Sequence, residues 1–245
     1  MPPRPRRGAA ASTPGAAPRN PAASSPGLQL GLPGVGVGAR GKITLGIDEA
    51  GRGPILGPMV LAAVALDTAA ARALTRAGLA DSKQYGAGAD ARARRAELAA
   101  LIRARACFVA IEVVEADEID ARVAHNQLNE LERERAIRMI ERAPRCARIL
   151  LDGAQMFRPL RDRFPEVRSY DRGEERHAAV AAASVVAKDR RDAWFVGMVD
   201  RYRSDFGEVT GGGYINAATR AFLRAYRDRF GDLPPETRRS WSVQL

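Results

Sequence analysis

The chain has 245 residues, of which 46% are hydrophobic and 28% charged, enough apolar material for one packed domain of ordinary size. The formal net charge is +10, but five basic residues lie in the first forty positions, where no acidic residue occurs. From residue 41 onward, 34 basic residues face 29 acidic ones. This mild excess fits an enzyme that meets polyanions through metal ions and local patches, although a general arginine bias contributes to it.

The sequence lacks the marks of membrane and secreted proteins. The apolar stretch 56–66 is too short to span a bilayer and is interrupted by Gly57 and Pro58. The N-terminus has arginines but no continuous apolar core, so no signal peptide is predicted. Cys107 and Cys146 have neither a metal-binding nor a redox spacing. A reduced, cytoplasmic protein is therefore expected.

Composition and periodicity divide the chain into two parts. Residues 1–40 are rich in Pro, Ala, Gly, Ser and Arg, and they are expected to form a disordered tail. Residues 41–245 are expected to form one domain in which strands alternate with helices. The expected strands are 43–48, 59–66, 107–114, 148–151 and 167–170, and the expected helices are 89–106, 126–142, 175–202 and 217–230. An opening hairpin followed by this alternation predicts an α/β fold, with a mixed β-sheet flanked by helices.

The first expected strand ends in two adjacent carboxylates, Asp48 and Glu49, and a tight turn with Gly51, Arg52 and Gly53 follows. Two acids at a strand end, with bare backbone amides and an arginine beyond them, suit a cation and a phosphate held side by side. Most acid pairs ahead of a glycine only close a strand with solvated charges. Taken alone, this segment leaves both interpretations open.

Asp152 repeats this pattern, because it ends the apolar run 149–151 and is followed directly by glycine. Strand ends on one side of a mixed sheet meet in space, so Asp48 and Asp152 are expected to face each other across neighbouring strands. Glu174 and Glu175, which precede the long helix, are further candidate carboxylates for this cluster. Carboxylates held together repel one another, and all-oxygen ligands favour Mg²⁺ or Mn²⁺ over zinc. The sequence therefore predicts a divalent metal site.

Two of the three lysines lie where phosphate contacts are expected. Lys83 lies in a polar loop, and Lys188 closes the alanine-rich stretch 181–188 of the long helix, which also contains Ser184 as a substrate-binding candidate. The alanines of that stretch are expected to let the helix pack closely on the sheet. Tyr214 follows three glycines, where its ring could stack on a sugar or base or could be merely half-buried.

These motifs occur in a characteristic order along the chain. They are DEAGRGP at 48–54, DSK at 81–83, LDG at 151–153, the stretch 181–188 and the Gly-Tyr loop at 213–214. In this order they resemble ribonuclease HII, the type 2 ribonuclease H family, from about residue 42 to the C-terminus. The resemblance implies a ribonuclease H-like fold with a C-terminal helical region that binds substrate. It also implies an endoribonuclease that uses two Mg²⁺ or Mn²⁺ ions.

The expected substrates are RNA–DNA hybrids and duplex DNA with embedded ribonucleotides, and the expected state is a monomer with no membrane partner. Residue by residue, the resemblance implies that Asp48, Glu49 and Asp152 are three of four catalytic, metal-binding carboxylates. It also implies a loop that reads the ribose 2′-hydroxyl, a phosphate-contacting lysine and a junction-sensing tyrosine, here Gly51, Arg52, Gly53, Lys83 and Tyr214.

The fourth acid departs from the family pattern. The family places a glycine-aspartate pair before the alanine-rich helix, and this chain has Gly173-Glu174. Glu174 is therefore the expected fourth ligand. Asp171 lies three residues earlier and is expected to face elsewhere, and Glu175 is expected to start the helix.

Two other functions remain open. One is a ribonuclease HIII-like activity, which needs several consecutive ribonucleotides, although residues 1–40 are too short and polar to supply that type's extra substrate-binding domain. The other is an inactive module that only binds hybrids. Retention of mutually repelling carboxylates speaks against the inactive module.

Overall fold

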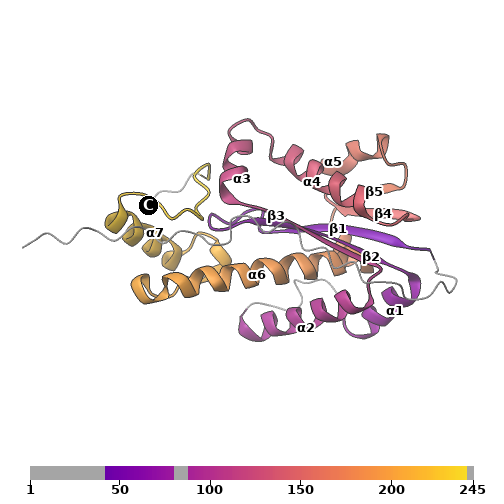
Figure 1. Ribbon diagram of the computed structural model, residues 1–245, viewed down its shortest axis with the longest axis horizontal. Coiled ribbons are helices and arrows are strands. Elements are labelled where there is room, and N and C mark those ends of the chain that lie inside the picture. The colour runs from indigo at the N-terminus through magenta and orange to yellow at the C-terminus, as the bar shows by residue number, and fades with distance from the viewer. Residues whose placement is uncertain (1–41, 80–87, 242–245) are drawn as a thin grey trace, which may run out of the picture.

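The computed structural model describes residues 42–79 and 88–241 of the chain. At its centre lies a five-stranded mixed sheet with the strand order β3-β2-β1-β4-β5 (Figure 1). The strands are β1 Thr44–Ala50, β2 Met59–Leu66, β3 Phe108–Val114, β4 Arg148–Asp152 and β5 Val167–Tyr170. β1 and β2 form an antiparallel hairpin extended by β3, whereas β4 and β5 run parallel to β1. The five expected strands and the α/β class are confirmed.

Helices cover both faces of this sheet (Figure 1). One face carries α1, α2 and α6, and the other carries α3, α4 and α5. Among the described residues, the short 3₁₀ turns η2, η3 and η4 connect these elements. The bounds are α1 Thr68–Arg76, α2 Ala89–Arg105, α3 Ala116–Val123, α4 Leu128–Arg142, α5 Ala154–Phe157, η2 Arg158–Asp162, η3 Gly173–Glu175, α6 Ala178–Phe206, η4 Gly211–Gly213 and α7 Ala217–Phe230.

The two covered faces explain why β2 is apolar throughout. All eight of its residues are buried, and alternate side chains enter the two opposite cores. The alanine-rich half of α6 packs close to β1, as expected: a Cβ on Gly46 would lie 2.1 Å from the carbonyl carbon of Ala179. This close approach requires glycine in β1, and it places Ser184 and Lys188 of α6 near the strand ends.

A third core joins the distal half of α6 to α7. It is built from a chain of aromatic rings, among them Tyr202, Phe206, Phe222 and Tyr226, with centroid separations of 5.2–6.2 Å. The expected C-terminal helical region is therefore confirmed. Within the described ranges, no helix combines the length and the low charge needed to cross a bilayer.

Several helix boundaries differ from the prediction. The helix expected at 175–202 covers Ala178–Phe206, because Arg172 has a left-handed backbone (φ 58°) and His177 is extended, which leaves Glu175 in η3. The helix expected from residue 126 begins at Leu128, since Asn126 has a φ of 59°. The short helices α1, α3 and α5 were not predicted. The expected tail at 1–40 and the Lys83 loop lie outside the described residues.

Candidate active site

The predicted acids meet at the ends of β1 and β4. These strands are parallel neighbours, with Ile47 opposite Leu151, so the next residues along them, Asp48 and Asp152, lie side by side. The Gly173 amide donates to Asp152 Oδ1 at 2.8 Å, which ties the η3 turn and its buried Glu174 to the same strand end. The expected meeting of Asp48 and Asp152 is thus confirmed.

The carboxylates affect one another's ionisation strongly. Burial raises the pKa of Asp48 well above its ordinary value, Glu49 and Asp152 raise it further, and a hydrogen bond with Ser184 opposes them. Burial likewise raises the pKa of Glu49 to about 7, with Glu132 and Asp152 adding to the shift and Arg52 opposing it. Buried acids in this condition are stabilised by a cation that balances their charge.

Oxygen donors of this kind suit Mg²⁺ or Mn²⁺. Across residues 42–79 and 88–241, however, no three His, Cys, Asp or Glu side chains already stand close enough to hold one ion together. Two of the carboxylates accept backbone hydrogen bonds instead: Asp48 Oδ1 from the Glu49 amide and Asp152 Oδ1 from the Gly173 amide, both at 2.8 Å. The donor set fits a divalent ion in charge and chemistry, and binding requires these side chains to turn toward it.

Metal removal should therefore make stability depend on pH. In metal-free protein the folded state holds the Glu49 proton up to a pKa of about 7, whereas an ordinary glutamate loses it near 4.5. Folded protein binds more protons between these values, so its stability is highest below them and falls as pH rises through that window, by about 1–3 kcal/mol. Denaturant unfolding in EDTA measures this slope.

Glu49→Gln removes one of two acids with a raised pKa, the other being Asp48, and serves as the control. It should make the slope shallower, and added Mn²⁺ or Mg²⁺ should stabilise the native protein more at about pH 7.5 than at about pH 5. An identical slope in the Gln variant would show that Glu49 is not the group responsible.

Three acids compete for the role of fourth ligand, and their surroundings differ. Asp171 is exposed, and its Oδ1 accepts a hydrogen bond from the Ala154 amide at 2.8 Å, at the start of α5. Glu175 pairs with Arg172 across the turn. Glu174 alone is buried, with 6% of its surface exposed. This agrees with the expectation that Asp171 faces elsewhere, and Glu174 stays our candidate for the fourth ligand.

The glycine turn after β1 lies against the Tyr214 loop. The amides of Ile55 and Leu56 both donate to the carbonyl oxygen of Gly213, at 3.0 and 3.1 Å. A Cβ on Gly53 would lie 3.3 Å from Cε1 of Tyr214, whose side chain is 57% exposed. The two segments expected to contact the ribose and the base beside it therefore form one surface.

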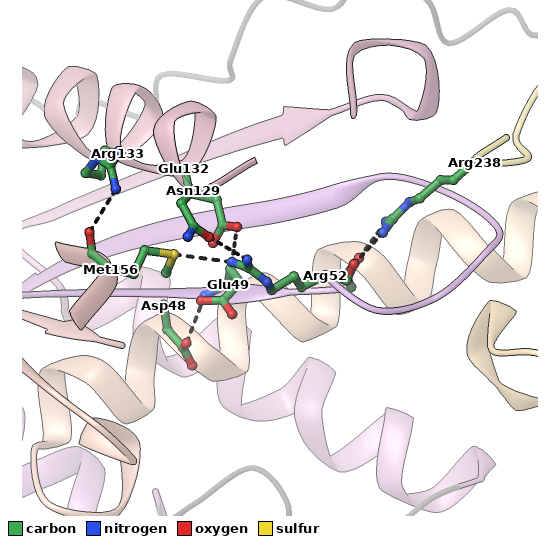
Figure 2. Close-up of polar contacts among 9 residues, drawn as sticks. Asp48, Glu49, Arg52, Asn129, Glu132, Arg133, Met156 and Arg238 are labelled. Carbon is green, nitrogen blue, oxygen red and sulfur yellow. Dashed lines mark hydrogen bonds and ion pairs between the residues drawn. The ribbon is translucent and has the colours of Figure 1, made fainter. Parts of the chain in front are cut away.

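Arg52, partly exposed, reaches from this turn across to α4. Its guanidinium pairs with Glu132 and donates to Asn129 Oδ1 at 2.7 Å, both on α4 (Figure 2). Glu132 is fully buried, and its Oε2 has no hydrogen-bond partner among the described residues. We did not predict it, although its position four residues after Leu128 and four before Ala136 places a carboxylate on the buried helix face.

Of the other residues predicted to contact substrate, Ser184 and Lys188 lie on α6 near the acids. Ser184 is buried in α6, where its hydroxyl bonds to Asp48, and Lys188 lies one turn further along, partly exposed. Ser184 therefore supports a carboxylate in this structure, while its predicted contact with substrate stays a prediction. Lys83 lies outside the described residues.

Comparison with known proteins identifies the family. The sequence matches the family model for ribonuclease HII over residues 45–244. The chain belongs to the ribonuclease HII family. A ribonuclease HII of Caldivirga maquilingensis is 35% identical over 214 residues, which cover 84% of this chain and 94% of that protein.

Solved structures agree with this membership. Ribonuclease H2 from Pyrococcus horikoshii OT3 matches with a TM-score of 0.69 and 28% identity, over 82% of this chain and 94% of that one. The RNase HII of Archaeoglobus fulgidus, solved in complex with PCNA, matches with a TM-score of 0.67 and 29% identity, over 83% and 96% of the two chains. An RNase HIII solved in complex with Mn²⁺ shares the fold at 20% identity and a TM-score of 0.63.

Membership in the ribonuclease HII family confirms the predicted activity. The protein is a ribonuclease H-type endoribonuclease that acts on RNA–DNA hybrids. The chain spans 94% of the Caldivirga and Pyrococcus proteins and 96% of the Archaeoglobus protein, so the comparison covers the acids, the glycine turn and the C-terminal helices together.

Proposed function

We propose that this ribonuclease HII also incises duplex DNA at single embedded ribonucleotides, using Asp48, Glu49, Asp152 and Glu174 as metal ligands. The observation that carries the proposal is the shared surface at the end of β1. There the clustered carboxylates lie next to a glycine turn, and an exposed tyrosine ring packs against that turn. The carboxylates would hold the ions that hydrolyse the phosphodiester. The glycine turn, which lets the backbone come close to a sugar, and the Tyr214 ring would recognise one ribose and the neighbouring base step.

Each part of the chain has a distinct task in this mechanism. Two divalent ions, Mg²⁺ or Mn²⁺, would activate the attacking water and stabilise the leaving 3′-oxygen when bound. Asp48, buried and hydrogen-bonded to Ser184 next to Asp152, would be the central ligand for these ions once its carboxylate turns toward them. No protein nucleophile is required, and the products carry 5′-phosphate and 3′-hydroxyl ends.

The experiment compares three duplexes that differ only in sugar content: one embedded ribonucleotide, a continuous RNA–DNA hybrid, and all DNA. Cleavage of the first two, loss of cleavage in EDTA and an intact third duplex are the expected results. Cleavage of the continuous hybrid alone would instead establish the ribonuclease HIII-like alternative. Metal-independent binding without cleavage would establish the inactive module.

Tyr214 offers a second test of the recognition surface. Stacking depends on the ring, so Tyr214→Phe should retain most activity, whereas Tyr214→Ala should lose about 1–3 kcal/mol of transition-state binding. The loss should be larger on a single embedded ribonucleotide than on a continuous hybrid, because the junction contact matters most there. Steady-state kinetics on both substrates measures the two losses. Equal losses would mean that Tyr214 only stabilises its loop and does not contact the junction.

A further inference from the structure

The C-terminal segment 236–241 pairs with the glycine turn along its length. The Gly57 amide donates to the carbonyl of Glu236, and the Arg238 amide donates to the carbonyl of Ile55, both at 2.8 Å. Leu56 and Thr237 form an isolated β-bridge between these two hydrogen bonds. Residues 236–241 thus pack along one side of the turn and of the residues that follow it, 51–57.

Arg238 joins the two segments through its side chain. The residue is fully buried, and its guanidinium donates to the carbonyl oxygens of Gly51, of Arg52 at 2.7 Å and of Gly57 at 2.9 Å. Figure 2 shows this guanidinium pointing at the Arg52 backbone. Trp241, under the same guanidinium, donates from Nε1 to the Gly53 carbonyl at 3.2 Å. The carbonyls of residues 51–53 therefore all accept hydrogen bonds from the C-terminal segment.

These hydrogen bonds also orient the amides of the turn. A trans peptide unit is planar, and its N–H points opposite to its C=O. The carbonyls of Gly51 and Arg52 belong to the same peptide units as the amides of Arg52 and Gly53. When Arg238 draws the two carbonyls inward, the two amides point away from it, toward the open side of the turn.

An arginine suits this position better than a lysine does. Its planar fork can reach several carbonyl oxygens at once, whereas a lysine presents one compact ammonium. A second buried arginine, Arg191, supports the same turn by donating to the Leu56 carbonyl at 2.9 Å. Burial, with a smaller effect of Arg191, lowers the pKa of Arg238 to about 10, so the group remains charged at neutral pH. Two cations therefore lie behind the turn.

We propose that Arg238 is a positioning residue for ribose recognition: it fixes the carbonyls of Gly51 and Arg52, and so presents the Arg52 and Gly53 amides to the 2′-hydroxyl. Trp241 holds the Gly53 carbonyl, whose peptide unit ends in Pro54 and has no N–H to present, so its part is to steady the turn. The proposal rests on the proposed function, because it concerns the same sugar-reading turn.

Binding of two matched duplexes tests it. The full-length chain carries Asp152→Asn to prevent cleavage, and its affinity is measured for a duplex with one ribonucleotide and for the same duplex in all-DNA form. Arg238→Gln should lower the ratio of the two affinities about fivefold to tenfold, the effect of one or two lost hydrogen bonds, with all-DNA affinity unchanged. Arg238→Lys should recover part of the ratio.

Arg239→Gln is the matched control, since it removes the same charge from the neighbouring residue. Arg239 is half-exposed and pairs with Asp232, so its loss should leave the ratio unchanged. Circular dichroism checks folding. If Arg238→Gln does not fold, Arg238→Lys, which keeps the charge but presents one ammonium in place of the planar fork, should still lower the ratio, though by less.

An unchanged ratio in folded Arg238→Gln, or in Arg238→Lys where that variant stands in for it, would overturn the positioning role. An equal loss of affinity for both duplexes would overturn it too, because it would indicate that Arg238 has only a structural role. A protein with intact Arg238 that does not prefer the ribonucleotide duplex would instead refute single-ribonucleotide recognition itself.

Discussion

Replacement of Glu174 by glutamine is expected to lower the cleavage rate by about a thousandfold, equivalent to several kcal/mol of lost transition-state stabilisation. Glu174 is buried in the turn that Asp152 holds through the Gly173 amide, where glutamine keeps the volume and removes the charge. Single-turnover cleavage of a ribonucleotide-containing duplex, at saturating Mg²⁺ and again at saturating Mn²⁺, measures the effect.

The neighbouring acids supply matched controls for this experiment. Asp171→Asn and Glu175→Gln remove the same charge within four residues, yet Asp171 accepts the Ala154 amide and Glu175 pairs with Arg172. Both should retain most activity. An inactive Asp171→Asn variant beside an active Glu174→Gln would assign the fourth ligand to Asp171.

The metal preference is a further readout at this position. Glutamate is one methylene longer than the aspartate expected from the family resemblance, and Mg²⁺ is stricter than larger ions about octahedral geometry. Glu174→Asp should therefore change the ratio of Mg²⁺-supported to Mn²⁺-supported cleavage, while glutamine lowers both.

The second large effect is expected from Gly51→Ala. Gly51 has a φ of +83°, and a Cβ there would lie 2.1 Å from Arg191 Nε and 2.8 Å from the backbone oxygen of Pro58. The buried arginine is bonded to Leu56 and cannot move aside freely. The substitution should cost about 2–4 kcal/mol of folding stability and abolish cleavage, as thermal unfolding and activity assays will show.

Gly53→Ala is the comparison that separates fold from recognition. Its Cβ would lie 3.3 Å from an exposed tyrosine ring, which can shift. The variant should fold almost as stably as the native protein and still cleave more slowly, because the methyl group obstructs the approach of the ribose. Full activity in Gly53→Ala would remove this position from sugar recognition.

Local patterns in the sequence were sufficient to place Asp48 beside Asp152. Both acids end an apolar run, and a parallel neighbour pair brings such ends together, as β1 and β4 show. Apolar runs, alternation and helical spacing also located the five strands of the described sheet and the long helices α2, α4, α6 and α7. The turn at 172–177 was misjudged because its left-handed Arg172 carries no mark that a propensity argument detects.

The supporting residues are harder to predict for a different reason. Glu132 lies on the buried face of α4, so its burial follows from helical spacing, but its partner Arg52 is eighty residues away. Arg238 has no local pattern at all, since its partners are backbone carbonyls 181 to 187 residues distant. Such contacts arise from tertiary packing, which a single sequence does not specify by spacing.

These distances also bear on how the enzyme is assembled. The β1–β2 hairpin is synthesised well before the residues that fix its turn, Gly213 and Arg238, the second of which lies 186 residues after its partner Arg52. Contacts between such distant residues carry a large loop-closure cost and form late in folding. A nascent or prematurely terminated chain can therefore hold its acids in place while the turn beside them is still loose. The surface proposed to distinguish ribose from deoxyribose is completed only after residues 236–241 have been made, long after the acids of β1 and β4.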